Sequence, residues 1–366
     1  MKALLISFSE LPTLQRHLYV LGAGLAKLGV EITTLGSRNL KIDFKLQSNN
    51  KLIGTPSSPK PSPQSLLAMK RELKKMAQMA IEIEPDVIHF INKHTWNYFL
   101  IRMLKKKLPQ TKFIHTFHDP VGHEGDSVQK GVILYHKIVE RLLDAIVVHS
   151  DISKEQTHTF LKPKCPVFQV PLGEKPWKPF SSVPFGSKEV LIFGRLNPYK
   201  GLNHYPKILD ELYNIDPGIH VTIAGKASDG IESSLLVEIG SKPNCTLTNR
   251  FVEDGDIDGY FERADIVLVP YTSITQSGVI LDAYSRSRPV VAFDIPGMAQ
   301  YVPEPENLVR AFDCAAFSRR VAELLSDGAS CEQEALKAWN FGKNRFSPSK
   351  MAEATKNVYS EITEFK

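Results

Sequence analysis

The sequence predicts an α/β protein made of two doubly wound, parallel-sheet domains with a cleft between them. Short β-branched runs alternate with amphipathic segments along the chain, which is typical of repeated βαβ units. The alternation is interrupted over residues 171–188, a stretch rich in Pro, Gly and Ser. The chain has 366 residues, more than one core usually holds, so two domains are expected.

The elements expected in the first half alternate in type. The strands are KALLISF, VEITTLG, PDVIHFI, TKFIHTF, DAIVVHS and PVFQVPLG, and the helices lie near residues 14–28, 65–83, 94–107, 128–143 and 151–161. The second half restarts with EVLIFGR, IHVTIAG, CTLTNRFV, ADIVLVPY and RPVVAFD. The expected domain organisation is a first domain over 1–172, a linker over 173–188, a second domain over 189–345 and a helical segment over 346–366. That last segment packs on the second domain or crosses back to the first, and GTPSSPKPSPQS is expected to be a loop.

Composition excludes several classes of protein. With 42% hydrophobic and 23% charged residues the chain is expected to be soluble and globular, and its longest apolar runs are far shorter than the roughly 20 residues of a membrane-spanning helix. The opening MKALLISFSELP has no small-residue cleavage site, so it predicts a buried strand and a cytoplasmic location rather than a secretory signal. The four cysteines are scattered, which favours neither disulfides nor a zinc site; they are Cys165, Cys245, Cys314 and Cys331.

Positive charge is concentrated in the first half of the chain. Residues 1–180 hold 26 Lys and Arg against 15 Asp and Glu, a net of +11, whereas the remainder nets −6. Much of the excess lies in MKRELKKMAQMA and IRMLKKKLPQ, which also carry apolar residues at helical spacing. These segments are either amphipathic helices that rest on an acidic membrane face or the solvated helix faces of a basic domain. No nucleic-acid motif accompanies them, so a DNA or RNA partner is not expected.

A turn in the second half predicts an anion site. In FGRLNPYKGLNHY, Arg195 and Lys200 follow a strand and precede a helix. Helix N-termini attract phosphates, arginine binds them in a bidentate manner, and lysine adds a compact charge. The alternative is a surface turn with unrelated cations.

Two further stretches place polar residues at the ends of strands, where ligands bind in doubly wound sheets. TQSG precedes a helix that begins near Ser277, and it offers N–H groups and hydroxyls to an anion. Asp282 in that helix could accept hydrogen bonds from a diol such as ribose. The alternative is a plain capped helix. In IHTFHDPVGHEGDS, His118 and Asp119 would face the cleft. The nearby His123, Glu124 and Asp126 lack the spacing of a metal site, so no metal is expected. A polar loop that positions a sugar or moves a proton is favoured instead. Three other histidines are expected to be structural: His89, His115 and His149.

Several of these motifs in this order resemble the retaining glycosyltransferases of family 4, which have the GT-B fold of two Rossmann-like domains. The resemblance is carried by FGRLNPYKGL, TIAGKA, ADIVLVPYTSITQSGVILDAYSRSRPVVAFDIPG and IHTFHD, and it is strongest over residues 188–300. It implies transfer of a sugar from a nucleotide-diphosphate sugar, UDP- or GDP-linked, to a hydroxyl acceptor such as a glycan or a lipid-linked saccharide. Configuration would be retained, with neither cofactor nor metal. The basic first half of the chain adds the expectation of polysaccharide biosynthesis in the cytoplasm, at the inner face of a membrane.

The resemblance also implies residue roles. Arg195 and Lys200 correspond to the pair that binds the diphosphate, and His118, with Asp119, to the catalytic residues near the donor sugar. The loop that meets phosphate and sugar corresponds to Thr275, Gln276, Ser277, Gly278 and Val279. Ribose and nucleoside contacts are implied at Asp282, Gly225, Lys226, Phe251 and Val252.

The chain departs from the family pattern twice. Ile274 stands where the family usually has a glutamate that contacts the donor sugar. The first turn, SFSELPTLQRH, lacks the glycine pair that often lines the acceptor side, where Arg16 or His17 could substitute. A catalytically silent nucleotide-sugar-binding subunit and a GT-B sugar-nucleotide epimerase are therefore the alternatives. A dinucleotide oxidoreductase would need a G-x-G-x-x-G turn, which the sequence lacks.

Overall fold

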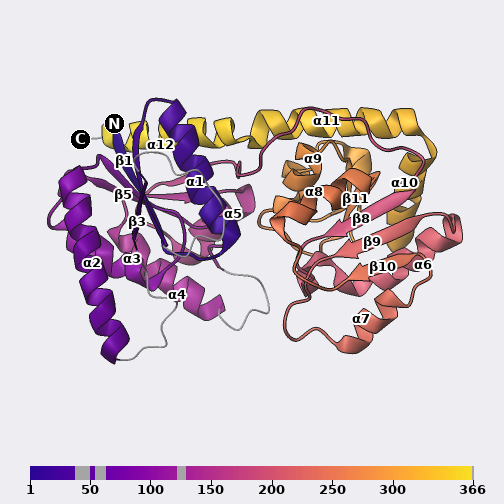
Figure 1. Cartoon of the computed structure of the whole chain (residues 1–366), viewed down its shortest axis with the longest axis horizontal. Coiled ribbons are helices and arrows are strands. Elements are labelled where there is room, and N and C mark those ends of the chain that lie inside the picture. The colour runs from indigo at the N-terminus through magenta and orange to yellow at the C-terminus, as the bar shows by residue number, and fades with distance from the viewer. Residues whose placement is uncertain (38–49, 54–62, 122–128, 365–366) are drawn as a thin grey trace. The chain divides into compact units, whose positions relative to one another are not determined.

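The computed structural model describes residues 1–37, 50–53, 63–121 and 129–364, and the account that follows is confined to them. The chain forms two compact units (Figure 1). The first comprises Met1–Glu174 and Pro348–Lys366, and the second comprises Lys175–Ser347.

The first unit is built on a parallel sheet. Its strand order is β3-β2-β1-β4-β5-β6-β7. The strands are β1 (Lys2–Ser7), β2 (Glu31–Ser37), β3 (Asn50–Ile53), β4 (Val87–Phe90), β5 (Lys112–Thr116), β6 (Ala145–Val148) and β7 (Val167–Gln169). Because all of these strands run parallel, their carboxyl ends meet at one edge of the sheet, where the order reverses between β1 and β4.

Helices cover both faces of this sheet (Figure 1). They are α1 (Pro12–Lys27), α2 (Pro63–Ile83), α3 (Thr95–Lys105), α4 (Gln129–Val139), α5 (Asp151–Gln156) and α12 (Pro348–Glu364). The alternation along β1 divides the core: Leu4 and Ile6 pack with residues of α2 and α3, whereas Leu5 packs with residues of α1 and α12.

The last helix is an integral part of the first unit. A Cβ on Gly24 of α1 would lie 2.7 Å from the Cβ of Ala352, so a glycine is what allows α12 to approach so closely. Tyr359 Oη also lies 2.8 Å from Nδ1 of His89 in β4, a contact buried beneath the helix. The first unit thus needs both ends of the chain to cover one face of its sheet.

The second unit has a parallel sheet in the order β10-β9-β8-β11-β12-β13. The strands are β8 (Glu189–Phe193), β9 (His220–Ala224), β10 (Cys245–Thr248), β11 (Ile266–Val269), β12 (Val290–Asp294) and β13 (Leu308–Arg310). The helices are α6 (Tyr205–Ile215), α7 (Ser233–Gly240), α8 (Asp254–Arg263), α9 (Gly278–Ser285), α10 (Cys314–Ser326) and α11 (Gly328–Phe346). Helices α6 and α10 pack together, as do α9 and α11, and all residues of β11 are buried.

The predicted fold class is confirmed, and each predicted strand is present. The strands β3 and β13 were not predicted, because four and three residues are too short for a periodic pattern. The segment predicted as a linker has no helix or strand from 175 to 188, but it packs within the second unit: Trp177 covers Gly342, and the Val183 N–H donates to Glu332 Oε2 at 2.9 Å. Most of the predicted loop at 54–65 lies outside the described residues, and α2 begins at Pro63.

The first basic segment lies in the amphipathic helix α2, whereas the second begins in α3 and its Lys106 and Lys107 follow the end of that helix. In α2 the cations Lys70, Arg71, Lys74 and Lys75 alternate with buried Leu73 and Met76, and Leu67 is 70% exposed. Within the described ranges, no helix combines the length and the apolar character needed to span a bilayer. Association with an acidic membrane surface stays a prediction.

Replacing Gly201 with alanine is expected to destabilise the second unit strongly. Gly201 has a φ of 82°, and a Cβ there would collide with the carbonyl group of Pro270. Gly201→Ala should therefore lower the free energy of unfolding by about 3 kcal/mol, as measured by urea denaturation. Gly230→Ala is the matched control, because Gly230 has a φ of 88° but nothing within 4 Å, so only the backbone term of about 1 kcal/mol applies. Equal losses in the two variants would contradict the prediction.

Candidate functional site

The turn after β8 holds two cations close together. Gly194 has a φ of 93° and ends the strand, a 3₁₀ turn spans Pro198–Lys200, and Gly201 leads into the next helical turn. Arg195 is exposed, whereas the Lys200 side chain is buried, with its Nζ 5.4 Å from the centroid of the Tyr271 ring. In the part of the chain that the structure describes, neither cation forms an ion pair with a carboxylate.

The environment of Lys200 disfavours its positive charge. Burial, followed by repulsion from Arg195, lowers the pKa of Lys200 to about 8, and Asp282 opposes the shift. Nζ has only a long hydrogen bond of 3.4 Å to the Phe193 carbonyl oxygen. An anion placed between the two cations would remove the repulsion and stabilise the charged amine.

Helix α9 begins beside this turn. Ser277 caps the helix, because its Oγ accepts a hydrogen bond from the Ile280 N–H at 3.3 Å, which leaves the N–H groups of Gly278 and Val279 in the first turn. A Cβ on Gly194 would lie 2.7 Å from Lys200 Nζ and 3.2 Å from Val279 Cγ2. The two predicted phosphate-binding stretches therefore meet at Gly194. Because Gly194 has no side chain, Lys200 Nζ and the Val279 side chain can lie close to its backbone.

Asp282 is held by two cations that the sequence did not pair with it. Its Oδ2 lies 2.7 Å from Lys175 Nζ and its Oδ1 lies 2.9 Å from Arg286 Nη1, with all three side chains at most 10% exposed. Arg286 is four residues away, at the C-cap of α9, a spacing that the sequence could have signalled. Lys175, by contrast, is brought in by the packed segment before β8. Both carboxylate oxygens are thus engaged, and ribose binding by Asp282 stays a prediction.

The other residues implied to contact the nucleoside follow β9 and β10. Gly225 has a φ of 153°, and a Cβ there would collide with the carbonyl group of Gly194, so these two strand ends approach closely. Lys226 is exposed, Phe251 is 57% exposed and Val252 is buried. Ile274 is 5% exposed and belongs to the apolar core. The position at which the resemblance leads us to expect a glutamate therefore holds a buried, uncharged side chain.

Thr275 and Gln276 complete the loop before α9. Thr275 is buried, and Gln276 is half-buried with an Oε1 atom that has no hydrogen-bond partner among the described residues. A buried acceptor of this kind can bind a hydroxyl or N–H group of a ligand.

In the first unit, the residues predicted for catalysis and for the acceptor side differ in how deeply they are buried. Arg16 and Asp119 are half-buried, whereas His17 is buried in α1. His118 follows β5, and its Nε2–H donates to the Ile91 carbonyl oxygen at 3.0 Å. Burial, with repulsion from His17, lowers the pKa of His118 to about 3, so the imidazole is neutral at physiological pH.

His149, predicted to be structural, lies against both His17 and His118: the three ring centroids are 4.9–5.1 Å apart. The sequence separation of these three residues hides this cluster. The loop residues His123, Glu124 and Asp126 lie outside the described residues.

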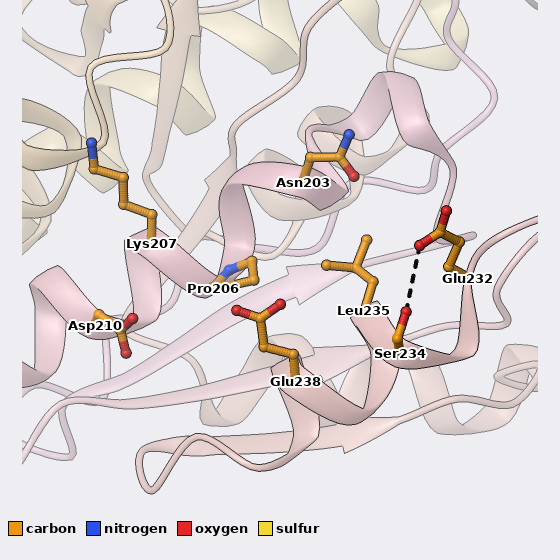
Figure 2. A pocket seen from close by; sticks show the side chains of 8 residues that line it. All are labelled: Asn203, Pro206, Lys207, Asp210, Glu232, Ser234, Leu235 and Glu238. Carbon is orange, nitrogen blue, oxygen red and sulfur yellow. Dashed lines mark hydrogen bonds between the residues drawn. The ribbon is translucent and has the colours of Figure 1, made fainter.

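A groove between the α6 segment and α7 is a second concave surface of the second unit (Figure 2). Carboxylates dominate its lining, which includes Asp210, Glu232 and Glu238 and one amine, that of Lys207. Asp210 is also bound by Lys242 at 2.7 Å. Because negative side chains repel phosphates, this groove does not suit a nucleotide diphosphate.

Two family models match the chain, one on each compact unit. Residues 14–173 match the model described as Glycosyltransferase Family 4, and residues 187–327 match the model described as Glycosyl transferases group 1. Both units are therefore similar to known glycosyltransferases.

Curated relatives match about half of the chain. Glycogen synthase of Mycobacterium tuberculosis is 27% identical over 179 residues, which are 48% of this chain and 42% of that protein. The D-inositol 3-phosphate glycosyltransferase of Corynebacterium efficiens is 29% identical over 193 residues, 50% of this chain and 44% of that protein. The chain thus matches less than half the length of each of these relatives.

Solved structures match over the whole chain. Sucrose-phosphate synthase from Thermosynechococcus elongatus has a TM-score of 0.77 at 16% identity, with 100% of both chains covered. HepE of Anabaena, solved in complex with UDP-glucose, has a TM-score of 0.68 at 16% identity, with 98% of this chain and 100% of that chain covered. These likenesses establish the GT-B fold.

Removing the charge of Asp282 is expected to destabilise the second unit. Asp282→Asn would leave Lys175 and Arg286 buried beside each other without their carboxylate, which should lower the free energy of unfolding by about 3 kcal/mol. Asp210→Asn is the control, since Asp210 pairs with Lys242 at the surface and should cost about 0.5 kcal/mol or less. Urea denaturation of the two variants checks this; a loss for Asp282→Asn no larger than that of the control would refute it.

Proposed function

We propose, from the similarity of both units to glycosyltransferases of group 1 and family 4, that this chain is a retaining glycosyltransferase. It would transfer a sugar from a nucleotide-diphosphate sugar to a hydroxyl acceptor such as a glycan or a lipid-linked saccharide. The matches of the two family models and the GT-B fold support this assignment. A cytoplasmic site beside a membrane is part of the proposal and is supported by the basic, amphipathic α2.

The observation that carries the proposal is the meeting of Arg195, Lys200 and the first turn of α9 at Gly194. Two cations without carboxylate partners in the described part of the chain and the N–H groups of a helix N-terminus form an arrangement suited to a diphosphate. The same groups stabilise the charge that develops on the diphosphate as it leaves. They provide there what a divalent metal provides in other enzymes, so transfer needs no metal at the diphosphate.

In the proposed reaction, the bond between the anomeric carbon and the diphosphate oxygen breaks. A bond from the acceptor oxygen to the same face of that carbon forms, and the proton of the acceptor hydroxyl passes to the departing diphosphate. Lys200 and Arg195 would bind the diphosphate oxygens throughout. The roles of His118 and Asp119 at the donor sugar, of Arg16 and His17 at the acceptor, and of Asp282 at ribose belong to the proposal through the family resemblance.

The donor is proposed to be a UDP- or GDP-sugar. HepE, which shares the fold, was solved with UDP-glucose, so UDP-glucose is the first donor to test. Phe251, 57% exposed beside the buried Val252, offers an aromatic face on which a base can stack.

The experiment that tests the function is incubation with UDP- and GDP-sugars and a mixture of glycan and lipid-linked acceptors. A new glycosidic bond with the donor's anomeric configuration, detected by mass spectrometry and NMR, is expected. An isomerised donor without acceptor would identify an epimerase instead.

A silent nucleotide-sugar-binding subunit is the second candidate function. It is favoured by the buried Ile274 and by the engagement of both Asp282 oxygens with Lys175 and Arg286. Tight nucleotide binding without transfer to any acceptor would support this candidate and refute the enzyme.

Loss of either cation of the turn is expected to weaken nucleotide binding. Arg195→Ala and Lys200→Met each remove charge-assisted hydrogen bonds to the diphosphate, so the affinity for UDP or GDP should fall about 10- to 100-fold in isothermal titration calorimetry. Lys207→Ala, which removes an exposed cation of α6 at the acidic groove, is the control and should leave the affinity unchanged. Unchanged affinity in both turn variants would remove the basis of the proposal.

Nucleotide affinity is also expected to depend on the charge of Lys200. Its pKa of about 8 in the free protein means that Lys200 loses its proton as the pH rises through that value, whereas a bound diphosphate favours the charged amine. Affinity should therefore fall above about pH 8, by up to tenfold per pH unit. In Lys200→Met this decline should be absent, and a decline of the same size in both proteins would show that another group causes it.

A further inference from the structure

Three histidines of the first unit come together at the carboxyl edge of its sheet. His17 is in the second turn of α1, His118 follows β5 and His149 follows β6. Their ring centroids are 4.9, 5.1 and 5.1 Å apart, which makes a nearly equilateral triangle. One ring nitrogen from each lies within 4.8 Å of the other two.

Hydrogen bonds at the outer side of the cluster fix two of the tautomers. Because a carbonyl oxygen only accepts, His118 donates Nε2–H to Ile91 at 3.0 Å, and His149 donates Nδ1–H to Val170 at 2.9 Å. The lone pairs of His118 and His149 are therefore on Nδ1 and Nε2, respectively. Histidines that bind metals have this arrangement, with the second ring N–H donated to a carbonyl or carboxylate.

Two nitrogens of the cluster are buried without a hydrogen bond. Among the described residues, His149 Nε2 and His17 Nδ1 have no hydrogen-bond partner, although both side chains are at most 2% exposed. A buried polar atom without a partner destabilises the folded protein, and a ligand of the cluster would offset that loss. The nearby His89 differs, since its two nitrogens lie 2.8 Å from Tyr359 Oη and Thr116 Oγ1.

A buried carboxylate adds negative potential. Oε2 of Glu174, which is 7% exposed, lies 3.7 Å from His17 Nδ1, and its charge also acts on His149. The cluster thus combines imidazole nitrogens with a nearby carboxylate, an environment that attracts a cation.

We propose that His17, His118 and His149 bind one divalent transition-metal ion of the Zn²⁺, Co²⁺ or Ni²⁺ class. With Zn–N bonds of about 2.0–2.1 Å and about 1.1 Å from nitrogen to ring centre, tetrahedral ligation places ring centroids about 5 Å apart, as they are here. Tetrahedral nitrogens are about 3.3 Å apart, whereas one nitrogen from each ring here lies within 4.8 Å of the other two, so ligation would draw the three nitrogens closer together. Imidazole suits these metals better than Mg²⁺ or Ca²⁺, which prefer oxygen.

The bound ion would tie α1 to the ends of β5 and β6 and leave a coordination position for an oxygen ligand, as three-histidine sites do. This ligation would replace the donor-sugar role proposed above for His118 and the acceptor role proposed for His17. The site lies wholly within the first unit, and diphosphate binding by Arg195 and Lys200 in the second unit does not depend on it.

The test is metal binding by the full chain. The protein is stripped with EDTA, dialysed, mixed with an equimolar amount of ZnCl₂, separated by gel filtration and analysed for zinc; Co²⁺ replaces Zn²⁺ to record the visible absorption of the bound ion. The variants are His17→Gln, His149→Gln and the half-buried His118→Gln. His158→Gln, which removes an exposed histidine of the same unit, is the control.

We expect the wild type and His158→Gln to retain about one zinc per chain, with a raised melting temperature and the intense absorption of tetrahedral Co²⁺. Each cluster variant should bind zinc at least about 100-fold more weakly and lose that absorption. Melting curves recorded without metal show which variants fold, and one folded cluster variant is enough for the comparison. Little zinc on the wild type, or equal zinc on the wild type and the cluster variants, would overturn the proposal.

Discussion

The second unit depends on close backbone approach at the carboxyl ends of β8, β9 and β11. Side chains are excluded where Gly225 meets the carbonyl of Gly194 and where Gly201 meets the carbonyl of Pro270. Gly194 in turn has space for Lys200 Nζ and Val279. These three glycines have positive φ, so the same residues satisfy the backbone conformation and the packing. Without this approach, the cations of the turn and the N-terminus of α9 would not lie at one place.

Two buried lysines of the second unit differ in the charged groups that surround their amines. Lys175 is neutralised within the protein by Asp282, which also binds Arg286. Lys200 lies beside another cation, and burial together with repulsion from Arg195 lowers its pKa to about 8. A structural ion pair is complete without a ligand, whereas the Lys200 environment becomes favourable once an anion is bound. This difference distinguishes the site at Gly194 from the ion pairs of Asp282.

Local patterns predicted most of the fold. Runs such as EVLIFGR and ADIVLVPY identify buried parallel strands, because a strand covered on both faces is apolar throughout. The turn with Arg195 and Lys200 could be recognised because its glycines, cations and flanking strand are adjacent in sequence. The short β3 and β13 and the packing of residues 175–188 carry no such pattern, and they follow from the space that the larger elements leave.

The sequence by itself determined the two α/β units, the cationic turn after β8 and the capped helix α9, because each is encoded in neighbouring residues. Only the tertiary structure decided that Lys175 neutralises Asp282 and that His17, His118 and His149 share one site. The physical reason is that such contacts depend on which parallel strands end side by side and on where each side chain points. No local sequence pattern indicates a contact between residues that are 31 to 132 positions apart. The strand order β1-β4-β5-β6 brings the three histidines to one edge of the sheet.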